Sequence, residues 1–338
     1  MKRYWRYAMS VDEDIEKKSF RPLVSIIIPV FNGSNYLNDA IDSALSQEYD
    51  NIEVLVIDDG STDNGQTENI AIGYGACIRY FHKSNGGVAT ALNLGITEMK
   101  GEYFSWLSHD DIYYPTKISE QIKLLESLEN KRDIVFSGFD VVNDEKQKLN
   151  RILPLERYSK AKLEVPLFAL FRGMISGCSL LIHKSHFDKH GLFREDLPTT
   201  QDFDMWFRIM RNQPSRICSG VSHKVRVHEM QKSRQHGNAH NRESNTLWIG
   251  IMEALDDEEK IQLDGSVERF YQEMYWMLLK YSKSDKAVQH AKQRTISQDG
   301  VRGIFSKFIF WLATALSLLF AAVGRIKRRM LGVSRNAL

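Results

Sequence analysis

Short apolar runs alternate with segments of helical spacing in the first third of the chain, and this alternation constrains the fold most strongly. The first run, 23–30, is rich in β-branched residues, and similar runs follow at 53–57, 78–81 and 103–107. A continuous apolar run of this length is typical of a strand buried on both faces. Strands that alternate with helices form right-handed crossover units around a parallel sheet. We therefore predict an α/β fold with a Rossmann-like, mostly parallel central sheet and flanking helices.

The expected helices of this part lie at 36–47 and 88–99, where apolar residues repeat at the spacing of one helix face. The second half of the chain is less regular. There we expect strands at 134–137 and 179–182 and a helix at 203–211. A C-terminal helical appendage rich in Trp, Met and Tyr is expected at 245–281.

The charge of the chain is unevenly distributed. The formal net charge is +2, but residues 300–338 hold seven basic residues and no acidic one. Within them, 308–323 carries no charge and is followed by four basic residues between 325 and 329. A spanning helix needs about 20 apolar residues, so the run predicts a spanning helix, a helix in the membrane plane, or a helix buried against protein. Because basic clusters favour the anionic cytoplasmic surface, we expect peripheral or monotopic association with the cytoplasmic side of the cell membrane, and no nucleic-acid partner.

The composition excludes several classes of protein. With 43% hydrophobic and 26% charged residues, the chain is neither disordered nor a polytopic membrane protein. Cys77, Cys178 and Cys218 lie far apart and predict reduced, mostly buried thiols. We expect no secretory signal, because the first 20 residues lack an apolar segment. Neither Gly-x-Gly-x-x-Gly between a strand and a helix nor a P-loop motif is present, which disfavours dinucleotide and P-loop chemistry.

Paired carboxylates follow two of the expected strands. Asp58-Asp59 comes after 53–57, and Asp110-Asp111 comes after 103–107. Ligands of parallel sheets bind outside the carboxyl ends of the strands, where a carboxylate accepts hydrogen bonds from a nucleoside or holds a divalent cation. Two structural alternatives stay open: 58–61 as a plain turn, and 109–111 as the cap of a helix over 113–125.

Several motifs, in order, make the sequence resemble the family 2 glycosyltransferases. The resemblance covers roughly residues 22–230, and its clearest motifs are VSIIIPVFN at 24–32, VIDDGSTD at 56–63, NGGVATALN at 85–93, LSHDD at 107–111 and QDFDMWF at 201–207.

The resemblance implies a GT-A fold and a role in making cell-surface polysaccharide or glycolipid. The implied reaction is the inverting transfer of a sugar from a nucleotide-diphospho-sugar, most simply a UDP-sugar, to a hydroxyl of a glycan or lipid-linked acceptor. Mg²⁺ or Mn²⁺ is the implied cofactor. The implied domains are a lead-in at 1–21, a nucleotide-sugar-binding half at 22–135, an acceptor-side half at 136–240, a helical appendage at 241–299 and a membrane-associating tail at 300–338.

The resemblance also assigns roles to single residues. Asp202 matches the catalytic aspartate, although Gln201 stands where the family often has Glu. Pro29, Asn32 and Asp59 are implied to line the nucleoside pocket, with Asp58 close by. Asp110 is implied to contact the ribose-diphosphate region, and Asp111 and His228 to bind the metal.

The chemistry of the reaction agrees with these roles. Transfer to a hydroxyl needs a base to take its proton and a countercharge for the departing diphosphate. Asp202 supplies a base on the acceptor side; its structural alternative is the N-cap of the helix that follows, which would lower its pKa. For His228 the alternative is a satisfied polar side chain.

Two other functions stay open. A sugar nucleotidyltransferase would also bind nucleotides on such a sheet, but a Gly-rich loop that contains Arg would then follow the first strand, where the chain has Pro29 to Asn32. A non-catalytic module that binds nucleotide-sugars or glycans would not need the base Asp202.

Overall fold

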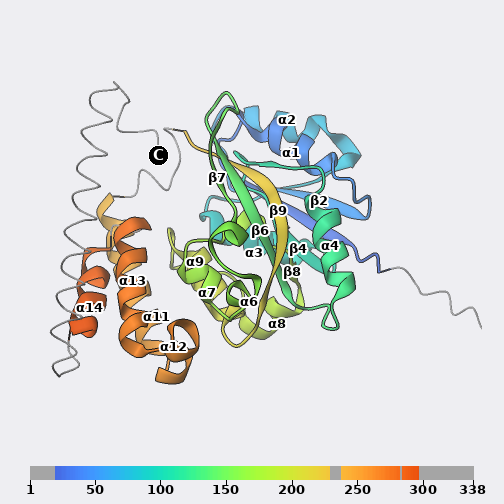
Figure 1. Ribbon diagram of the computed structural model, residues 1–338. Helices are drawn as coiled ribbons and strands as arrows, with labels where there is room; N and C mark the ends of the chain where they lie inside the picture. Colours follow the sequence, from blue (N-terminus) through green and yellow to red (C-terminus); the bar gives the residue numbers. More distant parts are fainter. Residues whose placement is uncertain (1–19, 229–236, 282–283, 297–338) are drawn as a thin grey trace, which may run out of the picture.

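The computed structural model describes residues 20–228, 237–281 and 284–296 (Figure 1). Most of the expected lead-in, up to residue 19, and the whole apolar tail lie outside these residues. Within the described ranges, no helix is long and apolar enough to cross a membrane.

The central sheet has five strands in the order β3-β2-β1-β4-β8. β1, β2, β3 and β4 run parallel, and β8 joins the edge antiparallel to β4. The predicted α/β fold with a mostly parallel sheet is thus confirmed. The strands are β1 (Val24–Val30), β2 (Ile52–Asp58), β3 (Arg79–His82), β4 (Tyr103–Trp106) and β8 (Ile182–His183).

Both faces of this sheet are covered, which explains why β1 is buried at all seven positions. Side chains alternate between the two faces of a strand. Ile27 belongs to the same apolar cluster as Leu92, whereas Ile26 and Ile28 join a second cluster that contains Ile41. The helices of this half are α1 (Leu37–Leu45), α2 (Gln66–Gly73), α3 (Val88–Glu98) and α4 (Lys117–Ser127), with the short 3₁₀ helix η1 (Gly75–Cys77).

A second sheet crosses the end of the first and carries part of the site. Its four strands have the order β5-β9-β6-β7. They are β5 (Ile112–Tyr113), β6 (Ile134–Val142), β7 (Lys148–Ile152) and β9 (Ser215–Arg226). Because β5 follows the Asp110-Asp111 pair directly and pairs with β9, the carboxylates lie where the two sheets meet.

Two sequence predictions about local structure are wrong. The helix expected over 113–125 begins only at Lys117, because Pro115 disfavours helical geometry before it and Tyr113 is in β5. The structure therefore excludes the alternative of 109–111 as a helix cap. The strand expected at 179–182 is reduced to β8, because Gly177–Ser179 form the 3₁₀ helix η2.

The helical appendage expected after the sheet is present and begins earlier, at Gly237. It packs on the α/β body through Trp248, whose ring lies 5.3 Å from that of Phe203 and 6.2 Å from that of Phe171. Its helices are α11 (Gly237–Ala254), α12 (Asp257–Asp264), α13 (Val267–Tyr281) and α14 (Asp285–Ile296). Between β7 and β9 the chain forms five further helices: α5 (Pro154–Arg157), α6 (Lys160–Leu163), α7 (Phe168–Phe171), α8 (Ser185–His190) and α9 (Gln201–Met210).

All three cysteines are free, as predicted. Cys178 and Cys218 are buried, and Cys77 is exposed.

Candidate functional site

The loops after β1, β2 and β4 meet at the carboxyl edge of the central sheet. A Cβ atom on Gly33 would lie 2.6 Å from the ring of His109, so the β1–α1 loop touches the loop of the acidic pair. Likewise, a Cβ on Gly60 would lie 2.6 Å from the backbone nitrogen of Asn85, and Gly60 has a φ of +74°. The absence of side chains at these two glycines lets the loops pack closely.

Asp58 organises the loop after β2. Its Oδ1 accepts a hydrogen bond from the Ser61 backbone N–H (2.9 Å), and its Oδ2 accepts one from the Tyr80 hydroxyl (2.8 Å). Burial alone would raise the pKa of Asp58, but these hydrogen bonds outweigh it and lower the pKa. Asn32 lies next to this loop, and its Oδ1 accepts the Thr62 N–H at 2.7 Å. Asp58 therefore has the turn-forming role that the sequence left open.

Asp59 ties this loop to the next one. Its Oδ1 accepts the Gly86 N–H (2.9 Å) and the Lys83 ammonium (2.6 Å), and its Oδ2 accepts the Gly87 N–H (2.7 Å). Pro29, by contrast, is buried within β1 beside Ile57 of β2. The nucleoside roles of Asp59 and Pro29 remain predictions.

Asp110 is paired with His228, which follows β9. The His228 Nε2 lies 3.0 Å from the Asp110 Oδ2, and both residues are 9% exposed. Burial would raise the pKa of Asp110, but the hydrogen bond from His228 and the electrostatic effect of the adjacent His109 outweigh burial and lower the pKa. The Tyr36 ring packs against the His228 ring at 4.9 Å between centroids. The structure thus keeps Asp110 ionised at the meeting point of the loops.

Arg226 fixes the position of this pair, and the sequence analysis did not single it out. Its side chain is buried, and its Nε donates to the Asp110 backbone carbonyl at 2.9 Å. Its Nη2 bonds Asp39 of α1 (2.7 Å), and its guanidinium lies over the Tyr36 ring at 4.4 Å. Its place in the Arg-Val-His run at 226–228 is the only signal in the sequence.

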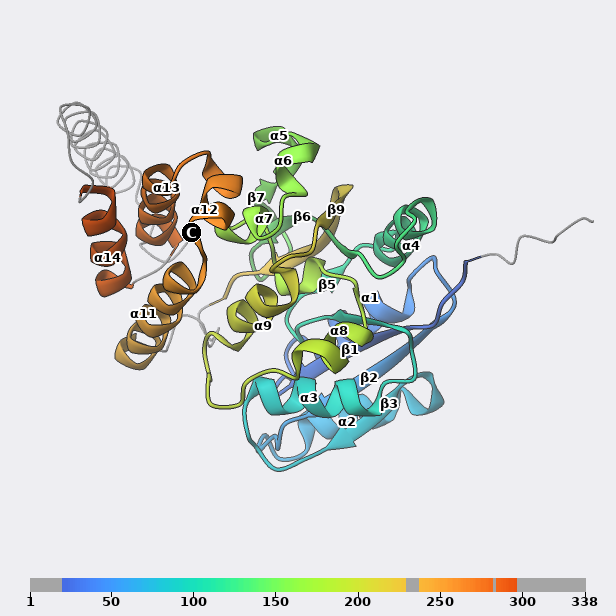
Figure 2. The same cartoon turned by 90° about the horizontal axis from the view of Figure 1, so that it is seen from below.

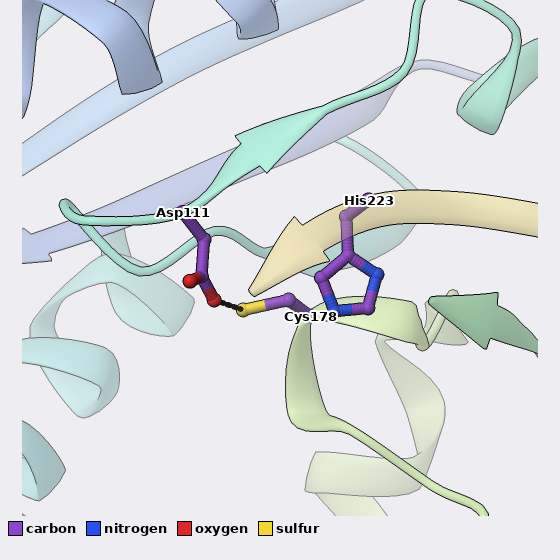
Figure 3. Close-up of side chains that lie close together, drawn as sticks. All are labelled: Asp111, Cys178 and His223. Atoms are coloured by element: carbon purple, nitrogen blue, oxygen red, sulfur yellow. Dashed lines mark hydrogen bonds between the residues drawn. The ribbon is translucent and has the colours of Figure 1, made fainter. Parts of the chain in front are cut away.

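Asp111 lies in a buried cluster with Cys178 and His223 (Figure 3). Its Oδ1 accepts the Arg226 backbone N–H (3.0 Å), and its Oδ2 accepts the Cys178 thiol (3.4 Å). Burial and the adjacent charge of Asp110 raise the pKa of Asp111 well above its usual range. Burial also raises the pKa of the Cys178 thiol and lowers that of His223 to about 3. This cluster therefore favours neutral groups.

Two groups of side chains were compared as holders of a divalent cation. One ligand atom each from Asp111, Cys178 and His223 lies within 4.8 Å of the others, but thiol and imidazole suit Zn²⁺ better than Mg²⁺ or Mn²⁺. These atoms already bond each other or nearby hydroxyls: the His223 ring nitrogens lie 2.9 and 3.0 Å from serine Oγ atoms. Asp110 Oδ2 and His228 Nε2 are likewise hydrogen-bonded to each other, at 3.0 Å, but this pair contains no thiol, and its carboxylate oxygen is the kind of ligand that Mg²⁺ and Mn²⁺ prefer. The Asp110–His228 pair fits such an ion better.

Asp202 lies in the first turn of α9. The N-cap of α9 is Thr200, so the alternative of Asp202 as the cap is wrong. The Asp202 carboxylate accepts the Phe203 N–H at 2.8 Å, yet its burial raises its pKa to about 6. One turn later, Trp206 packs 6.5 Å from Trp106 of β4, which anchors α9 on the sheet. Asp204 instead bonds the Arg208 Nε at 2.9 Å, which marks it as structural.

Comparison with known proteins gives three main findings. The model of glycosyl transferase family 2 matches residues 25–191. An uncharacterized glycosyltransferase of Rickettsia felis is 50% identical over 76% of this chain, and the match spans only 43% of that protein. An uncharacterized glycosyltransferase of Rickettsia prowazekii is 46% identical over 80% of this chain, and the match spans 85% of that protein. The crystal structure of S. aureus TarS 1-349 in complex with UDP-GlcNAc has the same fold, with a TM-score of 0.56 and 15% identity over 81% of this chain and 78% of that one.

Proposed function

This chain belongs to glycosyl transferase family 2 and has its GT-A fold, and from that premise we propose that it transfers a sugar from a UDP-sugar to a hydroxyl group of a glycan or lipid-linked acceptor, with inversion at the anomeric carbon. The TarS complex with UDP-GlcNAc supports the choice of a UDP-sugar. The chain covers less than half of the Rickettsia felis relative, so the proposal concerns this domain.

One observation carries the proposal: Asp110 is paired with His228 just after β4, and α9, the helix that begins beside Asp202, packs on the same strand through Trp206 and Trp106. The pKa of Asp110 is lowered, whereas that of Asp202 is raised to about 6. Environments that move the pKa values of two acids apart suit them to different tasks. An ionised Asp110 is suited to the cation side of the donor. A group with a pKa of about 6 is deprotonated at neutral pH and still able to accept a proton, as a general base must be.

The proposed step is a single displacement. Asp202 takes the proton of the acceptor hydroxyl while that oxygen forms a bond to the anomeric carbon. The bond between the anomeric carbon and the diphosphate oxygen breaks, and its electron pair leaves with UDP. Attack opposite the leaving group inverts the anomeric configuration.

We propose that Asp110 and His228 hold the divalent cation, Mg²⁺ or Mn²⁺. Their place together at the loop junction, and the carboxylate oxygen that Asp110 offers, support this role. When bound, the ion neutralises the charge that develops on the diphosphate. The earlier assignment of Asp111 as a ligand stays a prediction, although the hydrogen bonds of its carboxylate to the Arg226 backbone and Cys178 favour a structural role.

The proposed location is the cytoplasmic side of the cell membrane, where a lipid-linked acceptor would be presented. This proposal rests on the sequence alone, on the charge-free run 308–323 and the basic residues after it.

The test is to incubate the chain with a panel of UDP-sugars and Mn²⁺ and to measure the release of UDP. We expect hydrolysis of at least one UDP-sugar, because water can replace the acceptor. Asp110→Ala and His228→Ala should each lose Mn²⁺-dependent binding of UDP in calorimetry, whereas Asp202→Asn should keep it. A nucleotidyltransferase would instead release pyrophosphate from UTP and a sugar 1-phosphate. A non-catalytic module would bind the donor without turnover, and either result would refute the proposal.

A further inference from the structure

The C-terminal helical appendage touches the acceptor-side half next to Asp202. Figures 1 and 2 show α11 beside α9, and the contact between Trp248 and Phe203 joins the two helices. Glu243 of α11 accepts two hydrogen bonds through its Oε1, from the Thr199 backbone N–H (2.9 Å) and from the Thr200 hydroxyl (2.7 Å). Thr200 is the N-cap residue of α9, so these bonds hold the start of the helix that carries Asp202.

A second side chain of α11 contacts the same loop. The His240 Nδ1 lies 2.9 Å from the Thr199 Oγ1. Residues three apart lie on the same face of a helix, so His240 and Glu243 form one contact surface of α11. The loop before α9 is thus held by a helix that comes more than 35 residues later in the sequence.

Charge adds a second argument, because Glu243, held on Thr199 and Thr200, is close enough for its negative charge to act on Asp202. Burial raises the pKa of Asp202 most, and hydrogen bonds from two backbone N–H groups lower it. The negative charge of Glu243 is a further, smaller influence that raises the pKa. The other nearby acid on α9, Asp204, is neutralised by Arg208 at 2.8 Å and has Arg194 at 4.0 Å. Titratable His240 lies on the same face of α11 as Glu243.

The neighbouring position 201 supplies no negative charge. Gln201 is 6% exposed, and its side-chain oxygen is buried without a hydrogen-bond partner in the described part of the chain. The resemblance to family 2 places an acid there in many members, and this chain has a neutral amide instead. The acidic neighbour of Asp202 therefore comes from another element of the fold.

We propose that Glu243 is a positioning residue for the base Asp202, so that the C-terminal helical appendage completes the acceptor side of the site. Glu243 does this in two ways. Its hydrogen bonds fix the loop 199–200 and hence the start of α9, and its charge disfavours ionisation of Asp202 and makes it a stronger proton acceptor. The catalytic part of this inference rests on the proposed function, in which Asp202 is the base.

Glu243→Gln separates the two effects. The amide oxygen still accepts the bonds from Thr199 and Thr200, but the charge is lost. The pKa of Asp202 should then fall, because a like charge has been removed. We would measure this pKa directly by ¹³C NMR titration of carboxyl-labelled aspartate in the full chain, with Asp202→Asn to assign the signal. This measurement does not depend on activity.

The kinetic measurement uses release of UDP from the UDP-sugar that the unchanged chain hydrolyses fastest. The acid side of the kcat/KM profile should move to lower pH in Glu243→Gln, so that this variant keeps a larger fraction of its plateau activity at pH 5. Glu243→Ala also loses the hydrogen bonds, and kcat should fall by about 10- to 100-fold because the base is displaced. The KM for the donor should stay unchanged, since the side-chain hydrogen bonds of Glu243 within the described residues go to the loop before α9.

Glu253→Gln is the matched control. Glu253 lies on the same helix with a side chain 54% exposed, 3.9 Å from the ring of His290, whose pKa is lowered by burial. This variant should match the unchanged chain in the pKa of Asp202, in kcat and in thermal unfolding.

The outcomes separate the inference from the proposed function. An unchanged pKa of Asp202 in Glu243→Gln, or an unchanged kcat in a folded Glu243→Ala, overturns the role of Glu243. A lowered pKa in a chain that hydrolyses no UDP-sugar supports the electrostatic contact and refutes the proposed function instead.

Discussion

Asp202→Asn should make the protein more stable and nearly inactive. Burial raises the pKa of Asp202 from its ordinary 3.8 to about 6, so the ionised carboxylate opposes folding at neutral pH. This difference corresponds to about 3 kcal/mol. Because Asp202 keeps some contact with solvent, which screens its charge, we expect about 1–2 kcal/mol. Asparagine has the same shape and still accepts the Phe203 N–H.

The pH dependence fixes the sign of this effect. In the unfolded chain Asp202 ionises near pH 4, and in the folded chain near pH 6. The folded state therefore loses stability as the pH rises from 4 to 6, and the full penalty remains above pH 6. The stability gained by Asp202→Asn should be complete at pH 8 and absent below pH 4.

Urea denaturation at pH 8 and at pH 4 measures the free energy of unfolding. In parallel, hydrolysis of a UDP-sugar at pH 8 should fall by about 10²–10⁴-fold, the usual contribution of a general base. Asp204→Asn is the control, because it breaks the ion pair with Arg208 and should lower stability while keeping most of the activity. If Asp202→Asn is less stable than the unchanged chain at pH 8, the inferred burial of an ionised base is wrong.

Two more predictions concern the loop junction and the tail. Gly33→Ala should lower the free energy of unfolding by about 1–3 kcal/mol and weaken UDP binding, because the new methyl group would clash with the Val30 side chain and the His109 ring. Gly73→Ala, which meets nothing within 4 Å, should be neutral or slightly stabilising in the same urea titration. A chain that lacks residues 300–338 should bind UDP normally and no longer sediment with anionic vesicles; sedimentation unchanged from the full chain would contradict the membrane role of the tail.

The sequence predicted the central sheet and the place of the site because both depend on local patterns. A β-branched run such as 24–30 can be recognised without knowledge of its partners, and acidic residues directly after such runs must gather at one edge of a parallel sheet. Prediction failed where a few residues compete locally. Ser179 and Leu180 could continue a strand by composition, but Gly177 lies against the Trp106 ring and begins a 3₁₀ helix instead.

The division of labour among the acidic residues was decided by the tertiary structure. Asp110 and Asp111 are neighbours of the same type and both are buried, and no sequence rule tells which one pairs with His228 and which one bonds Cys178. Their difference comes from His228, Arg226 and Cys178, which lie 67 to 118 residues away along the chain.

The same holds for Asp202. Its raised pKa reflects burial and the charge of Glu243, a residue of a different helix. The sequence therefore determined which elements form and where carboxylates collect, since these follow from the spacing of neighbouring residues. Which carboxylate stays ionised, which is enclosed and which can accept a proton depended on solvent exclusion and on distant charges, and these exist only once the chain has folded.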